Sequence, residues 1–262
     1  MEHPSRIGNR LLAALPQADF DLLAPHLRQM RLERDAVLVH SGEPFEQIHF
    51  PCSGLIALVM DMPDGEAVAT AVVGKDGASG LVAALVSMPS PVTAVVRLPG
   101  TAWQISPARF QAALQRSVPI AGIIEVYTRT LMTQLQHVAA CNALHSVDAR
   151  MARWLLHLHD NVEVDDALPV TQEALAELLG VRRPTVTQVV NKLKGTGAIR
   201  ANRRGQIEID RPRLEAASCP CYKALRQRID DIISAGPTGP LHGISGHKAP
   251  GARDPDLTGI GS

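Results

Sequence analysis

Cationic and hydrogen-bonding side chains gather in the segment from Thr171 to Arg213. This segment carries nine Lys or Arg residues against four Asp or Glu, whereas the whole chain has 26 of each sign and no net charge. Arginine offers paired donors to guanine, and glutamine can both donate to and accept from adenine, so these residue types suit contacts with base edges. The local excess of positive charge suits phosphate. The side chains predicted to contact DNA are Thr171, Arg182, Arg183, Thr185, Gln188, Asn191, Lys192, Arg203 and Arg204.

Two short helices and a hairpin, spanning residues 169–210, are predicted to position these side chains. Thr171 suits the N-cap of the first helix, and Gly180 stands just past its end. Pro184 fits the first turn of the second helix, where its missing N–H costs nothing. Apolar residues recur along that helix at Val186, Val189, Val190 and Leu193. A basic hairpin follows as a wing, so the pattern indicates a winged helix-turn-helix. The alternative is an ordinary helical hairpin with a solvated charged face.

Residues 117–145 lack turn signals and are predicted to form one long helix. Their apolar side chains repeat at steps of three and four over about three heptads, which suits a coiled-coil-like seam between two copies of the chain. The alternative is a face packed onto the strand-rich part, and both can hold. We expect a homodimer. The side chains predicted at its interface are Ile120, Ile124, Tyr127, Leu131, Leu135 and Val138.

Short apolar runs alternate with turn signals between residues 30 and 105, at intervals of roughly a dozen residues, which indicates a small antiparallel barrel or sandwich. Helical patterns precede them at residues 8–28. Gly and Pro crowd the end of the chain, and we expect disorder there. The predicted parts are a strand-rich domain with N-terminal helices at 1–116, the long helix at 117–145, the winged helix-turn-helix at 146–215, and a C-terminal extension at 216–262, disordered from 235.

Composition indicates the cellular compartment of the protein. No stretch approaches 18 consecutive apolar residues, and the first ten residues lack the apolar core of a signal peptide. Four cysteines in 262 residues indicate reduced thiols rather than a disulfide framework. We therefore expect a cytoplasmic protein that does not span a membrane.

Three sets of residues match a known family. The first is Thr171, Leu175-Ala176, Leu178-Leu179-Gly180 and Thr185-Val186 in the helix-turn-helix. The second is Ser146-Val-Asp148-Ala-Arg150, and the third is Ser41-Gly-Glu43, Ile48, Phe50 and Ser53-Gly54 in the strand-rich part. Through these residues, which cover about residues 10–215, the chain resembles the CRP/FNR transcription regulators.

The resemblance implies an α+β fold with three parts. These are an N-terminal antiparallel β-roll of the cupin-like, cyclic-nucleotide-binding type, a long dimerisation helix and a C-terminal winged helix-turn-helix. It implies that a homodimer binds a palindromic site on double-stranded DNA, with RNA polymerase as a further partner. It also implies that Arg183 reads guanine. Pro184 stands where many relatives have an acid that reads cytosine, so we expect a different operator.

The resemblance does not identify an effector for the β-roll. Relatives that bind cyclic nucleotide carry Arg-Ser/Thr in the turn that holds the phosphate. Residues 76–96 contain no Lys or Arg, and Val92-Thr93 stands near that place, so a cyclic nucleotide is disfavoured. Oxygen-sensing relatives place most cluster thiolates near the N-terminus, whereas the first cysteine here is Cys52, so an iron–sulfur cluster is disfavoured too.

Four other residues could hold a cofactor. His137 and His145 could ligate haem, but solvated or packed imidazoles explain these histidines as well. Cys219-Pro-Cys221 could bind a metal or oxidise, but no matching pair stands nearby in sequence, so free thiols explain these cysteines as well. We predict no cofactor and no metal, and we leave the effector unknown.

Two other functions remain open. One is a regulator whose β-roll has lost its ligand and serves only as a dimer platform. The other is a cupin-like metalloenzyme, for which only His40 and His49, with Glu43 and Glu46, could begin a site. These histidines flank a predicted surface turn, and the sequence shows no nucleophile–base pair or phosphate loop. We therefore do not predict an enzyme.

Overall fold

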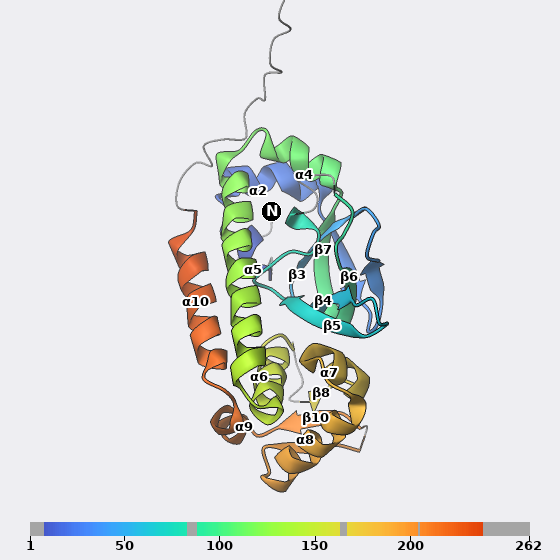
Figure 1. Ribbon diagram of the computed structural model, residues 1–262. Helices are drawn as coiled ribbons and strands as arrows, with labels where there is room; N and C mark the ends of the chain where they lie inside the picture. Colours follow the sequence, from blue (N-terminus) through green and yellow to red (C-terminus); the bar gives the residue numbers. More distant parts are fainter. Residues whose placement is uncertain (1–7, 83–87, 163–166, 204, 238–262) are drawn as a thin grey trace, which may run out of the picture.

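The computed structural model describes residues 8–82, 88–162, 167–203 and 205–237. A β-roll, a long helix beside it and a smaller, mostly helical domain below make up the molecule (Figure 1). The predicted α+β fold class is therefore confirmed. No helix in these ranges combines the length and apolar composition that a membrane span needs. The disorder expected from residue 235 concerns mainly residues 238–262, which lie outside the described residues.

The β-roll consists, in the described part of the chain, of two antiparallel sheets with the orders β1-β7-β3 and β2-β6-β4-β5. Alternate residues of β4 face opposite sides, as the period of a strand requires. Ile56 packs inside the roll with Val73 and Val96, whereas Leu55 and Ala57 belong to the core shared with the C-terminal domain. The strands are β1 (Arg28–Leu32), β2 (Val37–Val39), β3 (Ile48–Pro51), β4 (Leu55–Asp61), β5 (Ala67–Val73), β6 (Thr93–Leu98) and β7 (Gly100–Ile105).

Short helices close one end of the roll: α1 (Arg10–Ala13), α2 (Gln17–Leu23), η2 (Ala24–His26) and α4 (Pro107–Leu114). Asn9, which is fully buried, holds α1 in place. Its side-chain oxygen accepts hydrogen bonds from the first turn of α1, and its amide donates to the carbonyls of Pro51 at 2.9 Å and Gly77 at 3.0 Å. One side chain thus caps a helix and ties it to two loops of the roll.

The long helix is α5 (Val118–Leu144), with 27 residues. Ser117 caps it by accepting a hydrogen bond from the backbone N–H of Ile120 at 3.1 Å. At 1.5 Å per residue, α5 is about 40 Å long. It runs past the whole roll to the lower domain (Figure 1).

Most of the side chains predicted at a seam between two copies lie in the chain's own core. They are Ile120 (0% exposed), Ile124 (6%), Tyr127 (4%) and Val138 (6%). Leu131 and Leu135 are half-buried. The regular spacing of the first four arises because they pack against the β-roll and the C-terminal domain of the same chain. These four residues share one face, as expected, but burial within a single chain already explains their spacing, so contact with a partner stays a prediction.

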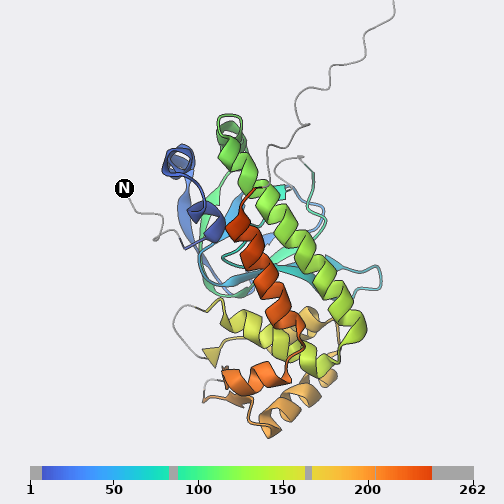
Figure 2. The same ribbon diagram turned by 90° about the vertical axis from the view of Figure 1, so that its left-hand side faces the viewer.

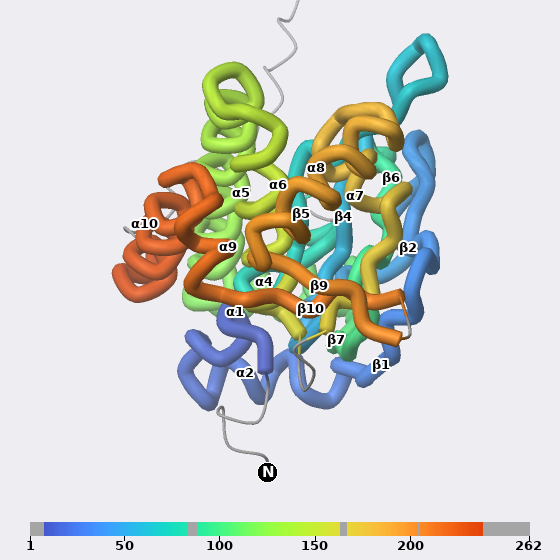
Figure 3. Tube along the Cα trace, turned by 90° about the horizontal axis from the view of Figure 1, so that it is seen from below, coloured from blue at the N-terminus to red at the C-terminus, as the bar shows by residue number. Residues whose placement is uncertain are grey.

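A second long helix, α10 (Cys221–Ala235), lies alongside α5 (Figure 2). It runs antiparallel, because Cys221 lies near the end of α5 and Pro237 contacts Gly122 near its beginning. Seen from below, α10 and the roll lie on different sides of α5 (Figure 3). A third side is left uncovered by the described residues, and there Thr128, Met132 (51% exposed) and Ala139 follow each other at steps of four and seven.

The C-terminal domain begins with α6 (Val147–His159), capped by Ser146, whose hydroxyl accepts from the N–H of Ala149. Its core contains Trp154, which is 1% exposed. The guanidinium of Arg153 lies 4.5 Å from the centre of the indole, and the His157 ring meets it edge-on at 6.0 Å between centroids. Trp154 therefore sits in an apolar core with a cation over its ring.

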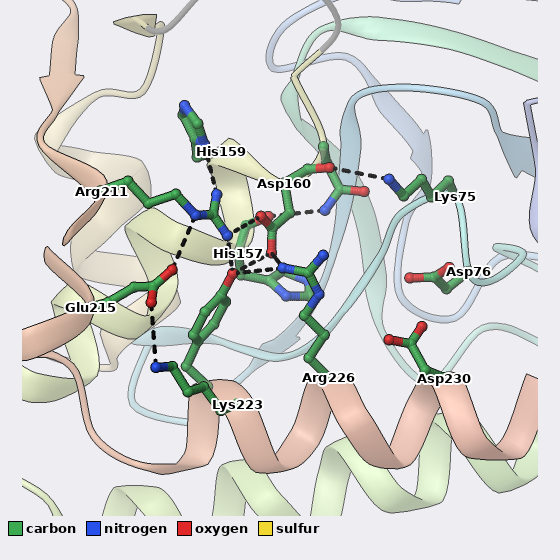
Figure 4. Close-up of polar contacts among 12 residues, drawn as sticks. Lys75, Asp76, His157, His159, Asp160, Arg211, Glu215, Lys223, Arg226 and Asp230 are labelled. Carbon is green, nitrogen blue, oxygen red and sulfur yellow. Dashed lines mark hydrogen bonds and ion pairs between the residues drawn. The ribbon is translucent and has the colours of Figure 1, made fainter.

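A polar network joins α6 to α9 (Arg211–Ala217) and α10 (Figure 4). Asp160, just past the end of α6, accepts from Arg211 at 2.9 Å and from the hydroxyl of Tyr222 at 2.7 Å. Burial, and then the hydrogen bond to Asp160, raises the pKa of Tyr222. Arg226 reaches the same carboxylate at 3.5 Å. The network fixes α9 and α10 onto the end of α6.

Candidate nucleic-acid interface

The helix-turn-helix consists of α7 (Gln172–Leu179) and α8 (Arg183–Gly195). The hydroxyl of Thr171 accepts from the N–H of Ala174 at 3.1 Å and caps α7, as predicted. Gly180 ends α7 in the left-handed conformation, with φ 61° and ψ 46°, which glycine adopts without strain. The chain then turns sharply into α8, whose first turn holds Pro184.

One face of α8 packs into the domain and the other meets solvent. The apolar side chains predicted for its inner face are buried: Val186 (0% exposed), Val189 (5%), Val190 (4%) and Leu193 (3%). They pack in one core with α6, α7 and the strands below. Because this core fixes the rotation of α8 about its axis, it also decides which polar side chains face outward.

Most of the predicted contact residues are exposed to solvent, on α8 and next to it. Those that are exposed are Thr171, Arg182, Arg183, Gln188, Asn191, Lys192 and Arg203, and Thr185 is half-buried. Arg204 lies outside the described residues. The side chains that begin α8 project from its N-terminal end, which is the end that enters the major groove in helix-turn-helix domains.

Two of these cations form ion pairs with acidic side chains of neighbouring helices. Arg183 lies 2.8 Å from Glu173 of α7, and Lys192 pairs with Asp148 of α6. The side chains of Arg183 and Lys192 are each 66% exposed. Exposed ion pairs contribute little to stability, so both cations can exchange their carboxylates for DNA at small cost.

The wing is a small antiparallel sheet with the order β8-β10-β9. Its strands are β8 (Ala167–Leu168), β9 (Ile199–Ala201) and β10 (Ile207–Ile209). Asn202 and Gln206 close the hairpin: the side-chain amide of Asn202 donates to Gln206 at 2.8 Å, and its oxygen accepts from the Gln206 N–H at 2.9 Å. The hairpin predicted from the sequence is present, with Arg203 exposed near its tip.

Three further side chains of this surface were not among the predicted contacts. Thr187 is exposed on α8, where its hydroxyl donates to Gln172 at 2.9 Å. Lys194 near the end of α8 and Arg200 on β9 are exposed as well. Helical spacing could have revealed Thr187, because it stands one turn after Arg183. Arg200 could have been found from the alternation of exposed and buried residues along a strand.

The helix-turn-helix also contacts the β-roll through an ion pair. Arg97 of β6 donates to both oxygens of Glu177 on α7, at 3.0 and 2.5 Å, and to Asp35 at 2.6 Å. The side chains of Arg97 and Glu177 are 16% and 17% exposed. Burial opposes the charge of Arg97, but the two acids outweigh this and raise its pKa. The paired geometry is the strong form of an Arg–carboxylate contact.

The roll contains a buried apolar cluster of its own. Leu32, Val39, Ile56, Val73, Ala94, Val96 and Ala102 form one buried cluster. Thr93, which stands near the place expected for a phosphate-binding residue, donates from its hydroxyl to Asp61 at 3.2 Å. The residues considered for a cupin-like metal site differ in burial. His49 is buried in β3, whereas His40 and Glu43 are exposed to solvent.

A β-roll followed by a long helix and a winged helix-turn-helix with a cationic outer face defines a class of two-domain transcription regulators. The model of a cyclic nucleotide-binding domain matches residues 29–117, and that of a Crp-like helix-turn-helix domain matches residues 149–217. With both domains in this order, the chain belongs to the CRP/FNR family of transcription regulators.

Solved structures share this fold. FixK2 from Bradyrhizobium japonicum is 18% identical with a TM-score of 0.62, and the match covers 74% of this chain and 98% of the FixK2 chain. A transcriptional regulator of the Crp/Fnr family from Eubacterium rectale is 20% identical with a TM-score of 0.61, covering 81% and 97%. The c-di-GMP-responsive global regulator CLP from Xanthomonas campestris is 20% identical with a TM-score of 0.59, covering 74% and 99%. No curated protein matches the chain.

Proposed function

We propose that the chain is a sequence-specific transcription regulator that binds a two-fold symmetric DNA site as a homodimer. The observation that carries this proposal is the outer side of α8, which presents Arg183, Gln188 and Asn191 to solvent on a helix fixed by a buried inner face. Arg and Gln or Asn at such positions can discriminate guanine and adenine in the major groove. Lys192, Arg203 and the newly found Lys194 and Arg200 suit the phosphates on either side.

The dimer is proposed through the open side of α5 rather than through its buried stripe. Thr128, Met132, Leu135 and Ala139 follow each other at steps of four, three and four, which is the spacing of a heptad seam. Small and flexible side chains there permit close approach of a second helix. In this arrangement the two α8 helices are related by a two-fold axis, so the half-sites form a palindrome.

The experiment that tests the proposal is selection of bound sequences from random duplex DNA, followed by fluorescence anisotropy with the selected duplex. We expect a palindromic consensus and binding at least a thousandfold tighter than to scrambled DNA, as specific regulators show. A consensus without symmetry would contradict the dimeric arrangement. Equal affinity for selected and scrambled duplexes would contradict sequence-specific regulation altogether. Contact with RNA polymerase remains a prediction.

The effector is proposed to be something other than cyclic AMP or cyclic GMP, despite the family of the N-terminal domain. Two features support this: residues 76–96 contain no Lys or Arg, and the carboxylate of Asp61 lies beside Thr93, where it would repel a phosphate. Calorimetry with cyclic AMP, cyclic GMP and c-di-GMP tests it. Saturable micromolar binding of either mononucleotide would contradict the proposal. A β-roll that binds no ligand and only supports the dimer is the second candidate.

A further inference from the structure

Three of the four cysteines of the chain meet one histidine where α5, α6 and α10 come together. Cys141 and His145 stand one helical turn apart at the end of α5, and Cys219 and Cys221 lead into α10. One potential ligand atom from each side chain lies within 4.8 Å of the other three. The part of the chain that the structure describes contains no other such group of three or more His, Cys, Asp or Glu.

Local structure explains why the four side chains converge. The i, i+4 spacing puts Cys141 and His145 on one face of α5. Across from them, the backbone N–H of Cys219 donates to the carbonyl of Ala149 on α6 at 3.3 Å, which fixes the first thiol of the second pair. Pro220 then starts α10 and returns Cys221 to the same side. Residues 78 positions apart in sequence are thereby brought into contact, because the Cys141 and Cys219 sulfurs lie 3.5 Å apart.

The distances fit a single tetrahedral ion. With Zn–S bonds of about 2.3 Å and Zn–N bonds of about 2.0–2.1 Å, neighbouring sulfurs in a tetrahedral site lie about 3.8 Å apart, and a sulfur and a nitrogen about 3.6 Å apart. The Cys141 and Cys219 sulfurs are 3.5 Å apart, and the Cys221 sulfur lies 3.6 Å from Nδ1 of His145. Three thiolates and one imidazole select soft or borderline metals over Mg²⁺ and Ca²⁺.

Two buried arginines supply the charge that such a site needs. Arg150 and Arg153 of α6 are 8% and 3% exposed and lie close enough to interact electrostatically with the cysteines. Among the described residues, Nε of Arg150 and two nitrogens of Arg153 have no hydrogen-bond partner. Arg150 also donates to the carbonyl of Leu179, and Arg153 lies over the ring of Trp154, but a buried guanidinium whose N–H groups are only partly satisfied is costly. Zn²⁺ with three thiolates and a neutral imidazole carries one net negative charge, which would compensate a neighbouring cation.

We propose that Cys141, His145, Cys219 and Cys221 bind one Zn²⁺ ion that fastens the start of α10 to the end of α5. All four positions of the ion are filled by the protein, so the site is structural. Cys141 and Cys219 are buried, which shields the metal from solvent. The bound ion sets how the C-terminal helix and the DNA-binding domain are held against the long helix, and it acts independently of the β-roll.

The first test is the metal content of full-length protein purified in reducing buffer without chelator. We expect about one zinc per chain by inductively coupled plasma mass spectrometry. Replacement by Co²⁺ is expected to give the intense visible bands of a tetrahedral site together with sulfur-to-cobalt charge transfer. Neither readout requires DNA, so the result is independent of whether the proposed regulatory function is correct.

The second test compares variants. Cys221→Ser removes a half-exposed ligand and is expected to weaken zinc retention at least tenfold against a competing chelator, and the double variant with Cys219→Ser is expected to lose the metal. Cys52→Ser is the matched control, because Cys52 lies at the end of β3 outside the cluster, and it should retain zinc like the wild type. Circular dichroism checks that each variant is folded.

Several results would overturn the proposal. One is wild-type protein that neither contains zinc nor retains it after stoichiometric addition under reducing conditions. Another is zinc content unchanged in the folded double variant. A cobalt spectrum without sulfur charge transfer, or thiol counting that finds Cys141 and Cys219 joined as a disulfide in freshly isolated protein, would also exclude the site as described.

Discussion

Arg183 is the residue whose chemistry most directly decides what the proposed interface recognises. Its guanidinium is exposed and held by Glu173, so it is oriented before DNA arrives. We expect Arg183→Ala to weaken binding to the selected operator by about 1–3 kcal/mol, as loss of a bidentate guanine contact does. Preference should relax at one position in each half-site. Anisotropy with a panel of single-base operator variants measures both effects.

The matched control is Arg109→Ala, an exposed arginine on α4 at the opposite end of the molecule from α8 (Figure 1). It removes the same charge and should leave the affinity and the base preference unchanged. If Arg183→Ala lost affinity equally for operator and scrambled DNA, its role would be a phosphate contact instead of base readout.

His49 gives the fold a pH dependence that its exposed neighbours do not share. It is 5% exposed in β3, and burial lowers its pKa from 6.5 to about 4. Between these values the unfolded chain binds a proton that the folded chain does not. The free energy of unfolding should therefore be unaffected above pH 6.5 and fall by up to about 3 kcal/mol as the pH drops to 4.

Denaturant unfolding between pH 4 and 7.5 measures this effect. His49→Gln should flatten the decline below pH 6.5, whereas His40→Gln, at an exposed position of the same domain, should follow the wild type. Parallel curves for all three proteins would place the acid sensitivity elsewhere.

Some site residues could be found from sequence alone, and others could not. The N-cap of Thr171, the left-handed Gly180 and the inner face of α8 are local features, decided by neighbours within one or two turns. The cysteine cluster depends on a contact across 78 positions. Cys219-Pro-Cys221 was recognised as unusual in the sequence, but its partners on α5 become visible only when α10 packs back onto that helix.

At the scale of elements, α5 shows that the spacing of apolar residues predicts which of them share a helix face but not what that face contacts. Helical spacing correctly indicated which apolar residues share a face of α5. It could not say whether that face meets a second chain or the chain's own roll, because burial looks the same in both cases. No helix was predicted for residues 221–234 of the C-terminal extension, although Tyr222, Leu225 and Ile229 recur there at helical spacing in α10.

The dimer seam proposed on the open side of α5 is tested by a substitution at Met132. Met132→Asp should convert a dimer into monomers at micromolar concentration, because it would bury an unpaired carboxylate in the seam. Sedimentation velocity measures the change. Leu131→Asp would not serve, because Leu131 packs against the chain's own core and its loss would destabilise the fold.

Val37→Asp is the matched control for Met132→Asp. Val37 is 44% exposed on β2, on the far side of the roll from α5 (Figure 3). It should leave the sedimentation coefficient unchanged. A wild-type monomer, or a Met132→Asp protein that sediments as a dimer, would contradict the seam.

At the scale of the whole molecule, Arg97 and Glu177 are the polar connection through which the β-roll holds the helix-turn-helix. Glu177→Gln keeps the shape but removes one charge from a largely buried pair. We expect the free energy of unfolding to fall by about 1–3 kcal/mol, and hydrogen exchange to quicken in α7. Glu173→Gln, whose side chain is 60% exposed on the same helix, should change the stability by less than about 0.5 kcal/mol. Equal effects of the two variants would show that the connection does not hold the domains together.

Trp154 makes the molecule suitable for optical study without an added label. The chain has two tryptophans, and Trp103→Phe would leave Trp154 as its single tryptophan. Emission from this buried ring should lie at shorter wavelengths than that of tryptophan in water, and the guanidinium 4.5 Å away makes it sensitive to small displacements of α6. A stopped-flow instrument could then follow movements at this junction in real time, whether the added solution contains an effector, a metal chelator or operator DNA.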